Sequence, residues 1–173
     1  SNKIEDKSNI LSRTKILNEI NQNKNQVYVL STDSIIEKVP SLKNFSKKTV
    51  NIKKGLKLNL TKFIEDLFEL NFIKRDFVHE PGEFSSRGNI LDIFSFSNIN
   101  PIRIEFDDDL IESIREFDIN TQLSIKNLNS MKISPNISSN RNESFFSLIN
   151  KDSILIIDDI NTILNAISKN NKT

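Results

Sequence analysis

The chain has 173 residues, enough for one ordinary domain or two small ones that share a linker, and 36% of them are hydrophobic. Its 24 basic and 23 acidic residues leave a formal net charge of +1, which excludes a global positive field that would attract a polyanion. The absence of cysteine excludes disulfides, thiolate metal sites and a catalytic thiol, and because no apolar run approaches the roughly 18 residues of a membrane span, we expect a soluble cytoplasmic chain with no membrane contact.

The N-terminal segment has the pattern of part of an α/β domain. Apolar residues at helical spacing predict a short helix over 13–20, and the continuous β-rich run 27–30 predicts a buried strand. Ser34 and Glu37 have the spacing of a capping box, which predicts a brief second helix. Because one strand does not make a sheet, we expect the remaining strands elsewhere in the chain.

An amphipathic helix is the clearest element of the sequence. Residues 49–52 are rich in β-branched side chains and are expected to be extended before a turn at Gly55, and Asn59 is then a suitable N-cap. The apolar residues that follow recur at steps of three and four: Leu60, Phe63, Ile64, Leu67 and Leu70. Their spacing gives the helix one apolar face, which we expect to pack on a sheet.

Strand-like segments separated by short turns follow this helix and predict an antiparallel meander. The segments are 72–78, 83–96, 102–106, 110–117 and 122–133. Pro81-Gly82 has the chemistry of a turn, and Gly88 indicates a bulge within the second segment. The alternation over 110–117 is imperfect, so the pattern leaves the pairing register of that strand open.

An α/β pattern returns towards the C-terminal end. The mostly polar residues 134–146 indicate a linker or exposed loop, the apolar run 153–159 indicates a buried strand, and the periodicity from Ile160 indicates a helix. We therefore expect an α/β plus α+β fold, in which an antiparallel β-rich module with one amphipathic helix is inserted between two fragments of an α/β domain. The predicted boundaries are 1–45 for the first fragment, 46–134 for the module and 135–173 for the second fragment.

The sequence contains no recognisable catalytic motif. Asp107–Asp109 invites a metal interpretation because hard cations bind several carboxylate oxygens, but these acids lie between two strands, where aspartate is an ordinary turn residue. His79 is the only histidine, and no phosphate-binding loop, nucleophile elbow or pair of zinc ligands occurs. We therefore expect no catalytic residue, no metal and no cofactor in this chain.

Three segments carry a resemblance to a known family. They are Glu80–Phe94, Pro101–Phe106 and Ile111–Ser124. These segments resemble the UvrB-homology region of the bacterial transcription-repair coupling factor (Mfd) family, and weaker similarity extends over nearly the whole chain. UvrB shares parts of the first two segments, but the run from Phe117 to Gln122 favours the Mfd family over UvrB.

The resemblance implies a protein-interaction role. In that family the inserted module binds the excision-repair protein UvrA, and the flanking α/β fragments form a separate domain. The full-length proteins are ATP-dependent DNA translocases that displace stalled RNA polymerase and recruit UvrA to the lesion. This chain would then be an N-terminal fragment, with the contacts to RNA polymerase and DNA, and the ATP and Mg of the motor domains, belonging to regions that it lacks.

The resemblance also implies a set of UvrA-binding residues. The basic positions of the family's motif correspond to Lys74 and Arg87, Arg75 is an adjacent candidate, and Ser85 stands where UvrB has an arginine. The whole predicted set is Lys74, Arg75, Phe84, Ser85, Arg87 and Phe94. A rim of Lys and Arg around an apolar strand surface suits an acidic protein partner, because such charges contribute orientation and association rate.

Three other interpretations of the chain stay open at this point. One is direct binding of nucleic acid through the local bases Lys47, Lys48, Lys53, Lys54 and Lys57, which would weaken steeply with salt. Another is the equivalent UvrA-binding region of UvrB itself. The last is metal-dependent hydrolysis at Asp107–Asp109, which predicts stabilisation of the fold by divalent ions.

Overall fold

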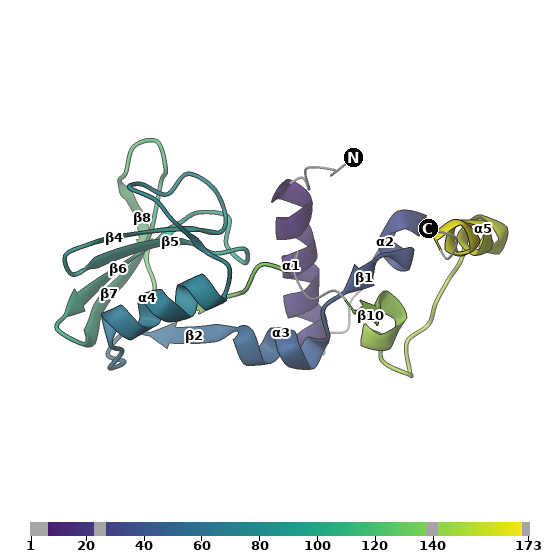
Figure 1. Ribbon diagram of the computed structural model, residues 1–173, viewed down its shortest axis with the longest axis horizontal. Coiled ribbons are helices and arrows are strands. Elements are labelled where there is room, and N and C mark those ends of the chain that lie inside the picture. Colours follow the sequence, from purple (N-terminus) through teal and green to yellow (C-terminus); the bar gives the residue numbers. More distant parts are fainter. Residues whose placement is uncertain (1–6, 23–26, 138–141, 171–173) are drawn as a thin grey trace.

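The computed structural model describes residues 7–22, 27–137 and 142–170, and over these residues the molecule is elongated (Figure 1). A β-sheet crossed by one helix lies at one end, two helices lie in the middle, and the C-terminal helix lies at the other end (Figure 1). The helical elements are α1 (Lys7–Asn21), α2 (Thr32–Ile36), α3 (Leu42–Lys48), α4 (Leu60–Glu69), the 3-10 helix η1 (Phe145–Leu148) and α5 (Ile160–Asn170). None of the helices in these described ranges is long and apolar enough to cross a membrane.

Six strands form the main sheet, in the order β3-β4-β5-β6-β7-β8. They are β3 (Ile73–Lys74), β4 (Glu83–Arg87), β5 (Ile90–Phe94), β6 (Ile102–Asp107), β7 (Leu110–Phe117) and β8 (Ser124–Asn127). Neighbouring strands from β4 to β8 are antiparallel, which confirms the predicted meander over these strands. The first predicted segment, 72–78, differs, because it contributes only the two residues of β3, which run parallel to β4. The mixture of helices with mostly antiparallel sheet confirms the expected β-rich α+β character.

Two short antiparallel ribbons lie outside the main sheet. Strand β2 (Val50–Lys53) pairs with β9 (Ser130–Ile133), and β1 (Lys38–Val39) pairs with β10 (Glu143–Ser144). The first ribbon joins the two chain segments that lead into and out of the main sheet. It therefore holds together the two ends of the segment that forms the main sheet.

Two of the predicted strand segments are each divided into two strands. Segment 83–96 forms β4 and β5, joined by a tight turn at Gly88, whose φ of 56° lies in the left-handed region. The interpretation of Gly88 as a bulge is therefore wrong: a glycine followed by asparagine also has the chemistry of a two-residue hairpin turn. Segment 122–133 forms β8 and β9, which belong to different sheets.

The register that the sequence left open is set by a bulge between β6 and β7. Glu105 lies opposite Ser113, but the next residue, Phe106, lies opposite Ile111. Glu112 is therefore the extra residue on β7. This insertion explains why the alternation of that strand is imperfect.

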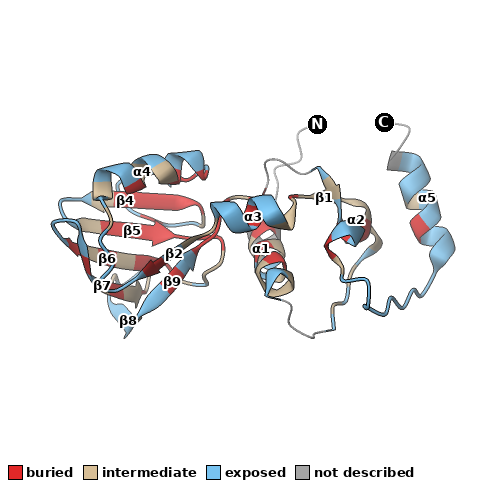
Figure 2. Cartoon of the chain, turned by 90° about the horizontal axis from the view of Figure 1, so that it is seen from below, coloured by how far each residue is buried: buried red, intermediate tan, exposed pale blue. Residues whose placement is uncertain are grey.

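Helix α4 packs its apolar side on one face of the main sheet, as predicted. Asn59 is its N-cap, and its side-chain oxygen accepts a hydrogen bond from the backbone N–H of Lys62 at 3.0 Å. Phe63 and Leu67 are buried against the sheet, whereas the outer side of the helix is exposed (Figure 2). Burial of such side chains contributes about 1.5–3 kcal/mol each. This packing determines which face of the sheet remains available for other contacts.

The turn that leads into β4 requires a glycine. Gly82 has a φ of 89°, and a β-carbon at this position would lie 2.5 Å from a ring carbon of Phe96. That separation is far inside van der Waals contact, so no other residue fits without displacing the ring. The predicted Pro81-Gly82 turn is confirmed.

Two predicted buried strands do not form. Residues 27–30 and 153–157 are irregular, and Val29 and Ile156 are almost fully exposed. A buried strand needs hydrogen-bonded neighbours, and no described residue pairs with either segment. An apolar run by itself therefore did not specify a strand.

The helices outside the main sheet agree only in part with the prediction from the sequence. Helix α1 contains the predicted helix, and α5 begins at Ile160 as expected. Helix α2 is capped by Ser31, whose side chain accepts from the N–H of Ser34, so the predicted capping box with Ser34 as the cap is wrong. Helix α3 was not predicted; its N-cap, Ser41, directly follows Pro40.

The segment expected to be a linker has more structure than predicted. Residues 143–148 form β10 and η1, while residues 138–141 lie outside the described residues. Phe145, within the predicted linker, and Leu148, just after it, are both buried. The domain boundaries after residues 45 and 134 remain predictions.

Candidate docking face

The side of the main sheet that faces away from α4 carries charged residues at alternate strand positions. We call it the arginine face, and it is formed by Ser85, Arg87, Asp92, Arg103, Glu105 and Arg115. The pairing register aligns four of these residues in one row across four strands: Ser85, Asp92, Arg103 and Arg115. Residues opposite one another in a ladder project to the same side, so this row is a continuous polar surface.

Asp92 is the centre of the arginine face. Its side chain is only 2% exposed, yet it binds two arginines. Oδ1 accepts from Nε of Arg103 at 2.7 Å, and Oδ2 accepts from Nη2 of Arg103 at 2.9 Å and from Nη2 of Arg87 at 2.8 Å. The bidentate bond to Asp92 raises the pKa of Arg103. These bonds compensate the buried charge of Asp92.

Each of these two arginines also stacks on a phenylalanine ring. The Cζ atom of Arg87 lies 4.7 Å from the ring centroid of Phe77, and that of Arg103 lies 4.6 Å from the ring centroid of Phe117. A guanidinium held by a carboxylate and an aromatic face has little freedom to rotate. The two arginines are therefore presented in fixed positions.

Glu83, the first residue of β4, holds the preceding loop against the sheet. Its Oε2 accepts from the backbone N–H groups of His79 and Glu80 at 2.9 and 3.1 Å. Its Oε1 accepts from Nε of Arg75 at 3.1 Å. His79, the only histidine of the sequence, thus binds Glu83 through its backbone N–H, which is a structural contact.

Two further residues of β4 bind the same loop at a single carbonyl. The backbone oxygen of Asp76 accepts from Oγ of Ser85 at 2.8 Å and from Nη1 of Arg87 at 3.0 Å. Strand β4 thus fixes residues 75–80 with all three of its side chains on this face. The loop is consequently an extension of the rigid sheet.

The arginine face also contains a cross-strand ion pair between Glu105 and Arg115. One carboxylate oxygen of Glu105 binds Arg115, and the other accepts from Oγ of Ser113 at 2.7 Å. Both charged side chains are about one-third exposed, so solvent screens their attraction. This pair contributes less to stability than the buried bonds of Asp92.

The six predicted site residues fall into three groups: three polar residues on the arginine face, one lysine on the α4 side of the sheet, and two buried phenylalanines. Ser85 and Arg87 meet at the carbonyl of Asp76 on the arginine face, and Arg75 binds Glu83 on the same face. Lys74 is exposed, but it lies opposite Phe84 in the β3–β4 ladder, and this register directs both side chains to the α4 side.

The two predicted phenylalanines are both buried. Phe84 packs edge-on against Phe68 of α4, with ring centroids 5.2 Å apart. Phe94 lies on the arginine face under Val78, Phe117 and Ile119. Phe94 therefore supports the arginine face from within, Phe84 belongs to the core under α4, and neither ring offers an exposed surface to a partner.

Sequence reasoning missed two residues of this arrangement. Arg103 could have been found, because a hairpin register places it opposite Asp92 and an aspartate in a central strand needs a cationic partner. Phe77 could not, because its position depends on how an irregular loop folds back over β4.

An ion pair on the opposite face gives this region a pH dependence. Glu116 accepts from Nζ of Lys126 at 2.8 Å and from Nδ2 of Asn100 at 2.7 Å. These bonds, with that to Lys126 the stronger, hold the pKa of Glu116 below its ordinary value. The folded chain therefore binds fewer protons here than the unfolded chain, and the stabilisation is present above the ordinary pKa and lost as the pH falls through the lowered one.

We accordingly expect Glu116→Gln to reduce the acid sensitivity of the fold. Its melting temperature should be lower than that of the unsubstituted chain at pH 6 and should fall less between pH 6 and pH 3, as followed by circular dichroism. Glu112→Gln is the control, because Glu112 is exposed on the same strand and forms no ion pair among the described residues. Parallel melting curves for Glu116→Gln and the unsubstituted chain would contradict this assignment.

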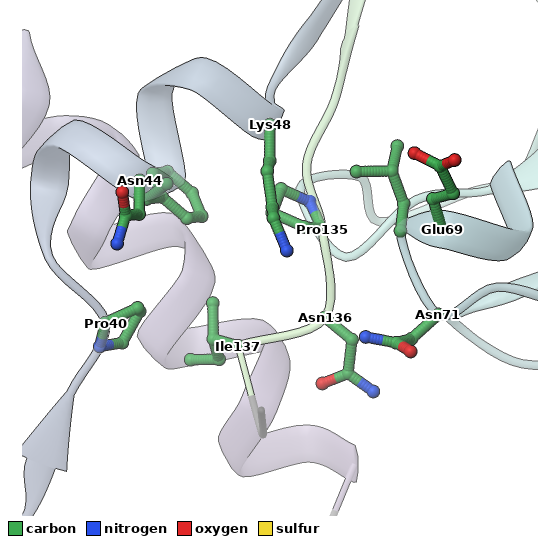
Figure 3. Close-up of a pocket in the computed structure, with 10 residues that line it drawn as sticks. Pro40, Asn44, Lys48, Glu69, Asn71, Pro135, Asn136 and Ile137 are labelled. Carbon is green, nitrogen blue, oxygen red and sulfur yellow. The ribbon is translucent and has the colours of Figure 1, made fainter. Parts of the chain in front are cut away.

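A small cavity lies away from the arginine face, between α3, the end of α4 and residues 135–137 (Figure 3). Its volume is about 60 Å³, which is room for a few water molecules. Lys48 and Glu69 line it together with Pro135. A cavity of this size does not accommodate an ordinary small-molecule ligand, so the sheet surface is the stronger candidate site.

Comparison with known proteins shows which family and which proteins this chain resembles. A family model described as the UvrB interaction domain matches residues 50–138. The chain is 31% identical over 123 residues to the transcription-repair-coupling factor of Bacillus subtilis, covering 71% of this chain and 10% of that protein. It is 36% identical over 132 residues to the factor of Rickettsia conorii, covering 74% and 12%. The chain thus spans about a tenth of the length of these relatives, and the resemblance to their family is confirmed.

Proposed function

We propose that this chain, which belongs to the UvrB interaction domain family, binds the excision-repair protein UvrA through its arginine face. The observation that carries the proposal is the fixed presentation of Arg87, the position to which the family resemblance assigns a UvrA contact, beside the adjacent candidate Arg75. The chain would serve as the UvrA-binding region of a transcription-repair coupling factor. It would contribute no catalytic group of its own.

Arg87 has hydrogen-bonding capacity left for a partner. A guanidinium has five N–H donors, and Arg87 uses one for the carbonyl of Asp76 and one for Asp92. Three donors remain, on a side chain that is 40% exposed. A carboxylate of the partner could accept two of them in parallel, which is the strongest common geometry for this pair.

The wider role follows from the relatives and is part of the same proposal. In a full-length coupling factor, UvrA bound at this face would be brought to the site of a stalled RNA polymerase. Contacts with RNA polymerase and DNA, and the use of ATP and Mg, would belong to regions outside this chain. The fold would therefore act as a recruitment module.

Titration of the purified chain with UvrA tests this function. We expect a one-to-one complex whose association rate falls as the ionic strength rises, because the arginine face would attract an acidic partner over a distance comparable to the screening length. Duplex DNA, titrated under the same conditions, is the comparison for the exposed lysines. The proposed function is wrong if UvrA does not bind at low salt.

A further inference from the structure

Phe77 combines exposure with a fixed position. Its side chain is 53% exposed, and its ring lies against the guanidinium of Arg87. We propose that Phe77 is an apolar anchor of the docking face, which inserts into an apolar pocket of UvrA that is rimmed by carboxylates. This inference rests on the proposed function and adds a contact residue to it.

The neighbours of Phe77 hold it in place from both sides. The carbonyl of Asp76 accepts two hydrogen bonds from β4, and Val78 is buried with Phe94 and Phe117. The next two backbone N–H groups bind the carboxylate of Glu83. The exposed ring of Phe77 thus stands on a loop whose backbone is already fixed, so docking would not need to order this loop and would lose little conformational entropy.

The pair of Phe77 and Arg87 defines the chemistry of the partner. Aromatic and arginine side chains are the types that contribute most at protein interfaces, where they fill desolvated pockets. The ring requires an apolar wall, and the three remaining N–H donors of Arg87 require an acceptor beside it. Arg75, which is also exposed, extends the demand for acidic groups along the rim.

Phe68 provides a matched control. It is 51% exposed, but it lies on α4, on the opposite side of the main sheet, with its ring edge-on to Phe84. We expect Phe77→Ala to weaken UvrA binding about 30-fold or more, the loss that marks an interface hot spot. Phe68→Ala should bind within about threefold of the unsubstituted chain, because such a difference is typical of residues outside the energetic centre.

A contact measurement keeps the test valid even if Phe77→Ala disturbs the loop. A photoreactive benzoylphenylalanine replaces Phe77 or Phe68 in the 173-residue chain, and we expect crosslinking to UvrA from position 77 only. If the unsubstituted chain binds UvrA but neither the affinity nor the crosslinking distinguishes the two positions, the anchor is wrong and the proposed function stands. Failure of the unsubstituted chain to bind UvrA would overturn both.

Discussion

Arg87→Glu is expected to lower the affinity for UvrA more than about a hundredfold while the chain stays folded. The change removes the three N–H donors that Arg87 has available and sets a negative charge where we propose an acidic partner. Truncating one member of a buried charge pair at an interface costs about 2–5 kcal/mol, and a reversed charge adds repulsion. A loss of about 2.7 kcal/mol already corresponds to a hundredfold change in affinity.

The measurement needs a control that loses an ion pair elsewhere. Arg13 of α1 is suitable, because it is paired with Glu37 and its exposure is similar to that of Arg87. Calorimetric titration with UvrA should show near-normal affinity for Arg13→Glu and loss of binding for Arg87→Glu, with both variants folded by circular dichroism. Equal affinities of the two folded variants would show that UvrA does not contact Arg87.

The local sequence pattern was sufficient to predict the helix and the strands that form and support the arginine face. Helix α4 followed from the spacing of its apolar residues and from Asn59, because a cap and one apolar stripe are properties of a short continuous segment. The strands of the meander followed for the same reason. What the pattern left out was the pairing: the turn at Gly88 and the extra residue Glu112 decide which side chains share a face.

Because the local sequence pattern did not predict strand pairing, it also placed in one site residues that the structure puts on opposite faces of the sheet. Lys74 and Arg87 are both basic and both lie on strands, but the β3–β4 register puts Lys74 on the α4 side. The centre of the face joins Asp92 to Arg103, which lie 11 residues apart on neighbouring strands. Contacts of this kind depend on the register, and a one-residue slip would move every side chain to the other face.

The exposed runs 27–30 and 153–157 show that a local pattern can also predict a strand that does not form. Their composition is that of buried strands, but a strand gains its stability from neighbours that satisfy its backbone groups and cover its faces. In the described residues neither run has such a neighbour. Composition therefore indicated what these segments are suited to, and only the tertiary structure determines whether the strand forms.

Asp92→Ala is expected to destabilise the chain by about 3 kcal/mol, because removing one partner of a buried ion pair leaves the other charge uncompensated. Arg103 would lose both bonds of its bidentate pair while its guanidinium remains mostly buried against Phe117. Glu105→Ala removes an equivalent carboxylate from the exposed pair with Arg115 and should cost less than about 1 kcal/mol. Urea denaturation measures both values.

A second substitution separates charge burial from lost packing. In Asp92→Ala the unpaired cation is the main cost, so adding Arg103→Met, which replaces that cation by an apolar side chain of similar length, should restore part of the lost stability. Arg103→Met alone leaves Asp92 with only Arg87 as a partner and should destabilise. If the double variant were less stable than Asp92→Ala by the full cost of Arg103→Met, the two residues would be energetically independent, and Asp92 would not be the group that holds the arginine face together.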